Sequence, residues 1–213
     1  MTRVYLIRHG ETEWNMARRY QGHSDVQLSE KGREQAQLLV RRLAGEKIDR
    51  VFASDLSRAV ETARVIAEGH HTEVIVEPRF RECNFGAWEG LTFTEIEKAY
   101  PEEMKTWNTA PGKLQLPGGE SFAIVQCRAH EAMMELVKKH DNEGVAIVAH
   151  GGTIRTLLCA ILEVDLDRAW QFRQENTALN IIDFYDCKGI IERINDVTHL
   201  IPGAFPTGKS RVE

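Results

Sequence analysis

Two histidines follow two of the most apolar segments of the chain, and their local settings match. Residues 4–7 (Val-Tyr-Leu-Ile) run into Arg8-His9-Gly10, and residues 145–148 (Val-Ala-Ile-Val) run into Ala149-His150-Gly151. Short apolar runs rich in β-branched residues predict buried strands. Because ligands bind outside the carboxyl ends of strands in open parallel sheets, we expect His9 and His150 to face one crevice. The glycine after each histidine would let the backbone approach a ligand closely.

Two arginines are expected at the same edge of the sheet. Arg8 directly precedes His9, and Arg58 comes just after the strand predicted at 51–53, near the start of the next helix. Two guanidiniums, two imidazoles and the N-terminus of the helix after Gly152 would together suit a phosphate dianion. Alone, a histidine can simply end a strand, and an arginine in the first turn of a helix is usually a surface residue. The matched settings favour the phosphate site.

Glu82 follows the strand predicted at 74–76 and adds a carboxyl group to this edge. A carboxylic acid beside a bound phosphate can protonate a leaving oxygen. Its neighbours are equally typical of a surface loop, and position alone favours that simpler interpretation.

The spacing of apolar residues predicts an α/β fold with a mostly parallel central sheet, helices on both of its faces and one antiparallel edge strand. The early strands alternate with helices, an order typical of parallel sheets with crossover helices. Ser29 and Ser121 are expected to cap two of the long helices. The predicted strands are 4–7, 51–53, 74–76, 145–148, 180–184 and 190–194, and the predicted helices include 94–100, 121–139 and 153–162.

The length of 213 residues favours a single domain, 1–213. Residues 80–120 are rich in Gly and Pro and are expected to form a substrate-loop insertion, with 203–213 as a loose tail. The tail contains Gly203–Ser210, which matches the P-loop pattern G-x-x-x-x-G-K-S letter for letter. A P-loop needs a helix directly after it, and the three residues that follow Ser210 cannot form one, so no nucleotide site is expected.

The composition of the chain limits the kinds of binding partner and the cellular setting that we expect. The formal net charge of −5 gives no support to binding of nucleic acid or a membrane surface through bulk charge. No apolar run reaches the roughly 18 residues that span a bilayer. The four cysteines form no Cys-x-x-Cys pair, and the chain opens without a secretory leader, so we expect a reducing, cytoplasmic setting.

The motifs, in this order, resemble those of the histidine phosphatase superfamily, the phosphoglycerate mutase-like proteins. Arg8-His9-Gly10-Glu11-Thr12 with Asn15 downstream is the most specific match, and the resemblance runs from residue 3 to about residue 185. The other matching segments are Ser54–Ala63, Arg81-Glu82 with Phe85–Gly90, and Val148–Gly152.

The resemblance implies roles for these residues. His9 would be the nucleophile that takes the phosphoryl group, and Glu82 would give a proton to the leaving alkoxide and later take one from water. Arg8, Arg58 and His150 would hold the phosphate oxygens. No metal or other cofactor is implied, because the arginines supply the positive charge. Further substrate contacts are implied for Asn15, Gln21, Gly22 and Gly151, with Glu120 and Ser121 at the rim.

Residues 83–92 resemble the phosphatase branch, since the basic pair that mutases of the family carry after the acid is missing. Fewer cations in this segment favour hydrolysis and a less anionic substrate. Trp88, Phe93 and Trp107 could form an apolar wall around the leaving group, or could be core residues. Together with Leu116–Ser121, the segment is similar to both broad-specificity and α-ribazole phosphatases.

The expected partner is therefore a small-molecule phosphate ester, with α-ribazole 5′-phosphate as one candidate, and neither nucleic acid nor a membrane. The sequence leaves open whether two copies of the chain form a homodimer through an exposed edge strand. A cofactor-dependent phosphoglycerate mutase and a non-catalytic phosphate-binding module are the alternatives. A metal hydrolase is disfavoured because the chain has no His-Glu-x-x-His segment and no Cys ligand pair.

Overall fold

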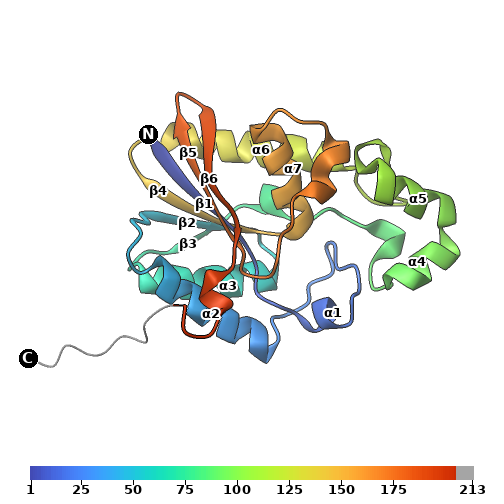
Figure 1. Ribbon diagram of the computed structural model, residues 1–213, viewed down its shortest axis with the longest axis horizontal. Coiled ribbons are helices and arrows are strands. Elements are labelled where there is room, and N and C mark those ends of the chain that lie inside the picture. The colour runs from blue at the N-terminus through green and yellow to red at the C-terminus, as the bar shows by residue number, and fades with distance from the viewer. Residues whose placement is uncertain (205–213) are drawn as a thin grey trace, which may run out of the picture.

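A six-stranded sheet forms the centre of the computed structural model, which describes residues 1–204 (Figure 1). The strand order is β3-β2-β4-β1-β5-β6. The first four of these run parallel, whereas β5 is antiparallel to both β1 and β6. The strands are β1 (Thr2–Arg8), β2 (Arg50–Ala53), β3 (Val74–Val76), β4 (Gly144–Ala149), β5 (Leu179–Tyr185) and β6 (Lys188–Asp196).

The α/β class and the mostly parallel sheet are confirmed. The reversed strand, β5, lies one position inside the sheet, and β6 is the edge strand beside it. Each of the six predicted strands is present, to within a few residues at either end.

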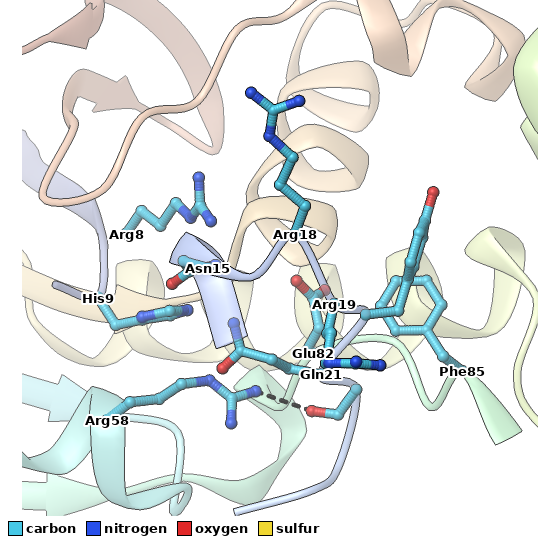
Figure 2. Close-up of a pocket in the computed structure, with 11 residues that line it drawn as sticks. Arg8, His9, Asn15, Arg18, Arg19, Gln21, Arg58, Glu82 and Phe85 are labelled. Atoms are coloured by element: carbon cyan, nitrogen blue, oxygen red, sulfur yellow. Dashed lines mark hydrogen bonds between the residues drawn. The ribbon is translucent and has the colours of Figure 1, made fainter. Parts of the chain in front are cut away.

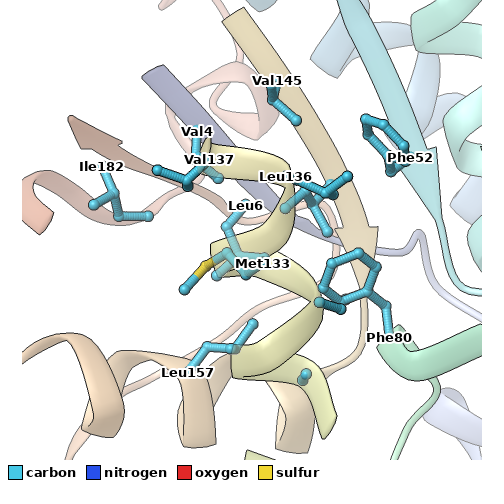
Figure 3. Packing of buried hydrophobic residues seen from close by; sticks show 14 of the residues in the cluster. Val4, Leu6, Phe52, Phe80, Met133, Leu136, Val137, Val145, Leu157 and Ile182 are labelled. Carbon is cyan, nitrogen blue, oxygen red and sulfur yellow. The ribbon is translucent and has the colours of Figure 1, made fainter. Parts of the chain in front are cut away.

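Helices cover both faces of the sheet (Figure 1). The helices α2 (Glu30–Leu43) and α3 (Ser57–Gly69) pack on one face, and α6 (Phe122–Lys139) and α7 (Gly151–Ile161) pack on the other. Alternation along β1 supplies both cores, because successive side chains of a strand point to opposite faces. Val4 and Leu6 join the α6–α7 core, where Met133, Leu136 and Leu157 cover the sheet (Figure 3), and Tyr5 and Ile7 join the α2–α3 core.

Strand register sets the position of the two histidines. β1 and β4 are parallel neighbours with Arg8 opposite Ala149, so His9 and His150 leave the sheet at the same level. The backbone N–H of His9 donates to the carbonyl of Ala149 at 3.1 Å. The prediction that neighbouring strands deliver both histidines to one edge is confirmed.

The helix caps follow the sequence. The Ser29 hydroxyl accepts from the Gly32 N–H at 3.0 Å and begins α2, and the Ser121 hydroxyl begins α6. Ser and Thr are favoured at this position because their oxygen satisfies an otherwise unpaired N–H of the first turn.

The 80–120 segment is more regular than its composition predicts. It contains α4 (Phe93–Ala99), which the sequence predicts, and α5 (Pro101–Thr109), which the prediction missed. Pro101 begins α5, where a missing N–H costs nothing. Figure 1 shows α1 (Glu13–Met16), α4 and α5 gathered beyond one end of the sheet.

Aromatic residues give the 80–120 segment a core of its own. Trp88 and Trp107 are buried, at 0% and 3% exposure, and pack edge to face at 5.8 Å between ring centroids. Phe93 is exposed, and none of the three lines the cavity described below. Of the two interpretations, that of core residues is therefore correct for Trp88 and Trp107, and the apolar wall around the leaving group is wrong. Trp107 packs against Phe122 of α6 at 4.8 Å between ring centroids.

The predicted tail, 203–213, and the P-loop-like match within it lie almost entirely outside the described residues, 1–204. Within the described residues, no helix is both long enough and apolar enough to cross a membrane.

Candidate active site

His9 presents one ring nitrogen to a cavity at the carboxyl edge of the sheet (Figure 2). Its Nδ1 lies 2.7 Å from the carbonyl oxygen of Gly10. A carbonyl can only accept, so Nδ1 carries the proton and Nε2 keeps its lone pair. The ring of His150 lies 5.1 Å away between centroids, tilted by 57°.

Arg58 fixes the opposite tautomer in His150. The fully buried Arg58 guanidinium donates from Nε to Nδ1 of His150 at 3.2 Å, so Nε2 of His150 carries the proton. That N–H is buried and has no acceptor among residues 1–204. The two other nitrogens of Arg58 donate to the carbonyls of Ser24 and Gly22 at 2.9 and 2.8 Å. One ring therefore offers a lone pair and its neighbour offers a hydrogen-bond donor.

Burial and the arginines keep both imidazoles neutral. Burial lowers the pKa of His9 well below its ordinary value, and the charges of Arg58 and Arg8 lower it further. The pKa of His150 is lowered well below its ordinary value by burial and by Arg58. A neutral imidazole can act as a nucleophile, whereas a protonated one cannot.

Arg8 and Arg58 carry the positive charge of the site. Burial lowers the pKa of each guanidinium to about 10, so both stay charged at neutral pH. Arg8 donates from one terminal nitrogen to the carbonyl of Gln174 at 2.6 Å. Its Nε is buried and unpaired among the described residues, which leaves a donor that an anion can satisfy.

Glu82 lies on the N-terminus of α7. Its Oε2 accepts from the N–H of Gly152 at 3.0 Å, and its Oε1 accepts from Thr153 and Cys83 at 3.1 and 2.9 Å. The sequence interpretation assigned this helix N-terminus to the phosphate. The structure gives two of its N–H groups to Glu82 instead, because the positive end of a helix dipole attracts a carboxylate as well as a phosphate.

The cavity encloses about 180 Å³ and holds most of the predicted residues. Glu82 is 9% exposed, so it is not the surface residue that its loop position favoured. His150 and Gly151 are not among the residues that line the cavity. The residues that line it are Arg8, His9, Asn15, Arg18, Arg19, Tyr20, Gln21, Gly22, Arg58, Glu82 and Phe85.

Four lining residues, Arg18, Arg19, Tyr20 and Phe85, were not assigned to the site from sequence. The sequence did offer one indication for Arg18, Arg19 and Tyr20: they directly precede Gln21, which was assigned to the site. The Arg19 side chain is held by contacts within the protein, because it donates to the carbonyl of Gly90 and to the carboxylate of Glu95. Arg18 is exposed and has a left-handed backbone, with φ at 54°. Arg18 and Arg19 therefore add positive charge to the cavity lining. The expectation of a less anionic substrate was based on residues 83–92 alone and did not include these two arginines.

The groups that pack against the glycines after the two histidines differ from those expected. The sequence interpretation had Gly10 and Gly151 letting the backbone approach a ligand closely. A side chain at Gly10 would lie 2.5 Å from the carbonyl oxygen of Gly32 in α2, and one at Gly151 would lie 3.0 Å from the guanidinium of Arg155. The space at Gly10 is taken by a helix and that at Gly151 by arginines. Arg155, which the sequence reading missed, donates to the carbonyl of Phe172 at 2.9 Å.

The predicted rim residues lie outside the cavity lining. Ser121 caps α6, and Glu120 pairs with Arg128. Within residues 1–204, no cluster of three or more His, Cys, Asp or Glu side chains has the arrangement that would hold a metal ion.

The sequence also matches a family model. Residues 4–197 match the histidine phosphatase superfamily, branch 1. The chain is 38% identical to phosphoserine phosphatase 1 of Hydrogenobacter thermophilus over 200 residues, covering 94% of this chain and 95% of that one. It is 36% identical to the probable phosphoglycerate mutase GpmB of Serratia proteamaculans, covering 94% and 95%.

Solved structures agree in fold. Bacillus stearothermophilus YhfR superposes with a TM-score of 0.90 at 36% identity, covering 94% of this chain and all of that one. An Escherichia coli K-12 protein described as a candidate α-ribazole-5′-P phosphatase superposes with a TM-score of 0.83 at 28% identity, covering 92% and 97%. The chain belongs to the histidine phosphatase superfamily, and it is an enzyme of the phosphatase class.

Proposed function

We propose that the protein hydrolyses small-molecule phosphomonoesters through a phosphohistidine on Nε2 of His9. The observation that carries the proposal is the opposed tautomer pair: Nδ1 of His9 is tied to the Gly10 carbonyl, while Nδ1 of His150 is tied to Arg58. This arrangement leaves a lone pair on His9 and an N–H on His150 for the same phosphoryl group.

In the first step, Nε2 of His9 attacks phosphorus and the bond from phosphorus to the ester oxygen breaks. Glu82 supplies a proton to that oxygen, and the alcohol leaves. In the second step, water attacks the phosphohistidine while Glu82 takes the water's proton, which restores His9 and releases phosphate. The charge that develops on the phosphoryl oxygens is stabilised by Arg8, Arg58 and the N–H of His150.

Hydrolysis is favoured over mutase activity because a mutase must keep water away from its phosphohistidine. Residues 83–92 lack the basic pair of the family's mutases, and we assign part of the 80–120 segment, through Phe85, to substrate contact. The substrates to compare first are α-ribazole 5′-phosphate, from the sequence, and phosphoserine, from the names of the relatives. Mutase activity and binding without turnover are the competing functions.

The test is rapid-quench trapping of the enzyme with radiolabelled phosphate ester, followed by acid and base treatment. We expect a phosphoenzyme that is labile in acid and stable in base, and that is absent in His9→Asn. His71→Asn, at an exposed histidine with a left-handed backbone that Asn tolerates, is the matched control and should label like wild type. An unlabelled wild-type enzyme that still turns over, or an active His9→Asn variant, would refute the proposal. Rapid interconversion of phosphoglycerates with little free phosphate would favour the mutase.

A further inference from the structure

Arg128 on α6 holds the backbone of the segment that carries Glu82. One terminal nitrogen donates to the carbonyls of Arg79 and Arg81 at 2.7 and 2.8 Å, and the other donates to the carbonyl of Glu82 at 2.9 Å. One guanidinium therefore contacts three carbonyls within four residues. The Arg81 carbonyl also accepts from the Thr153 hydroxyl at 2.8 Å, and the Glu82 carbonyl also lies 2.9 Å from Nε2 of His23. A planar guanidinium with five fixed donors can make such a set, whereas the ammonium of lysine cannot reproduce its geometry.

Glu120 extends the same arrangement to the other side of Glu82. Its carboxylate accepts from Arg128 at 3.0 and 2.8 Å, and it also accepts from the N–H of Asn84 at 2.9 Å. The backbone N–H of Glu120 donates to the carbonyl of Asn84 at 2.9 Å. Arg128 and Glu120 thus fix the backbone before, at and after Glu82.

The carboxyl group of Glu82 is held by a different helix. It rests on the N–H groups of Gly152 and Thr153 in α7, and the Thr153 hydroxyl also donates to the carbonyl of Arg81 at 2.8 Å. The backbone at Glu82 is therefore held by Arg128 of α6, with Thr153 of α7 also bonded to the neighbouring Arg81, whereas the carboxyl group of Glu82 is held by α7. A shift of the backbone would move the carboxyl group off the α7 donors.

We propose that Arg128 is a positioning residue for the acid–base function of Glu82, and that it acts through Glu82 without touching substrate. This inference rests on the proposed function of the site. A misplacement of about 1 Å in a reacting group can cost on the order of 100-fold in rate. The loss should fall on substrates that need a proton on the leaving oxygen.

The test compares Arg128→Lys with wild type on glycerol 2-phosphate, a poor leaving group, and p-nitrophenyl phosphate, an activated one. The value of kcat/KM is compared because it reports steps up to release of the alcohol. We expect kcat/KM to fall by about 10- to 100-fold on the alkyl ester and by less than about 3-fold on the aryl ester. In a Glu82→Gln background, Arg128→Lys should cost nothing further, since the group it positions is gone.

Arg79→Gln is the matched control. The Arg79 side chain ties the same segment to the same helix through Glu135 at 2.7 Å, but it does not hold the backbone at Glu82. This variant should keep wild-type values on both esters. Glu120→Gln is the second probe, and it should reproduce the alkyl-selective loss in weaker form if Arg128→Lys does not fold.

Equal losses on the two esters, or a full additional loss in the Glu82→Gln background, would overturn the positioning role. A loss in Arg79→Gln equal to that in Arg128→Lys would show that any loosening of the segment suffices, and would overturn it too. Trapping of the wild-type phosphohistidine separates the two proposals. If it forms while Arg128→Lys shows no selectivity, only the role of Arg128 fails.

Discussion

Gly152 should be required by the chemistry more than by the fold. Substituting Gly152→Ala places a Cβ 2.5 Å from Oε1 of Glu82, whereas ordinary contact begins at 3.4 Å. The carboxyl group must therefore retreat by about 1 Å, away from the N–H groups that orient it. The group that moves is the end of a side chain, so the fold can accommodate the change.

The size of the effect follows from these distances. A displacement of about 1 Å predicts a loss on the order of 100-fold in kcat/KM for a substrate with a poor leaving group. General acid catalysis contributes about 100- to 10,000-fold, which sets the upper limit. Some stability should also be lost, at about 1 to 3 kcal/mol for each buried N–H group that Glu82 no longer satisfies, while the fold itself is retained.

The adjacent glycine provides the control. Gly151→Ala meets the flexible end of Arg155 at 3.0 Å and Arg8 at 3.5 Å, and it leaves Glu82 undisturbed. We expect a loss below about 5-fold in Gly151→Ala, similar on glycerol 2-phosphate and p-nitrophenyl phosphate because phosphate binding by Arg8 is common to both. Thermal melting of both variants checks the fold.

The reasoning is refuted if Gly152→Ala loses activity equally on both esters, or keeps it on both. It is also refuted if Gly151→Ala shows the larger alkyl-selective loss. A collapse of the melting temperature in Gly152→Ala would show that the clash is relieved by the backbone and not by Glu82.

Three further outcomes are expected. Arg58→Ala should lower the free energy of unfolding, since it leaves the buried carbonyl of Gly22 without a donor, at about 1 to 3 kcal/mol, and the partly buried carbonyl of Ser24 without one at a smaller cost; chemical denaturation measures this, and a neutral substitution would contradict the assigned contacts. Because His9 and His150 have pKa values well below the ordinary 6.5, the unfolded chain takes up protons below pH 6.5 that the folded chain does not, so stability falls as pH falls. His199, whose pKa burial lowers to about 4, adds to this pH dependence, so His150→Gln should weaken the dependence in urea unfolding without abolishing it; a pH-independent wild type would rule this out. Turnover should persist in excess chelator, and loss of activity that is restored by a divalent metal would contradict a site that relies on guanidiniums.

Much of the framework could be predicted from local patterns. Apolar alternation predicts β1 and β4, and Ser29 and Ser121 predict the starts of two helices, because these signals depend on neighbours within a few residues. The helix α5 was missed because the Pro and Gly residues of the surrounding segment predict a loop, although Glu102, Met104 and Lys105 favour a helix. The packing of Trp107 against Phe122 of α6 is a tertiary contact that no local pattern shows.

The residues of the site were largely in the sequence, but their arrangement was not. The sequence by itself determined that two histidines and Arg8 meet at one edge, because parallel strands that end in His-Gly leave no other placement. Only the tertiary structure decided that Arg58 fixes the tautomer of His150 and that Glu82 takes the first N–H groups of α7. These contacts join residues about 70 to 92 positions apart in the chain, at 3.2 Å or less. Their geometry depends on how helices pack across the sheet, and no local pattern encodes that packing.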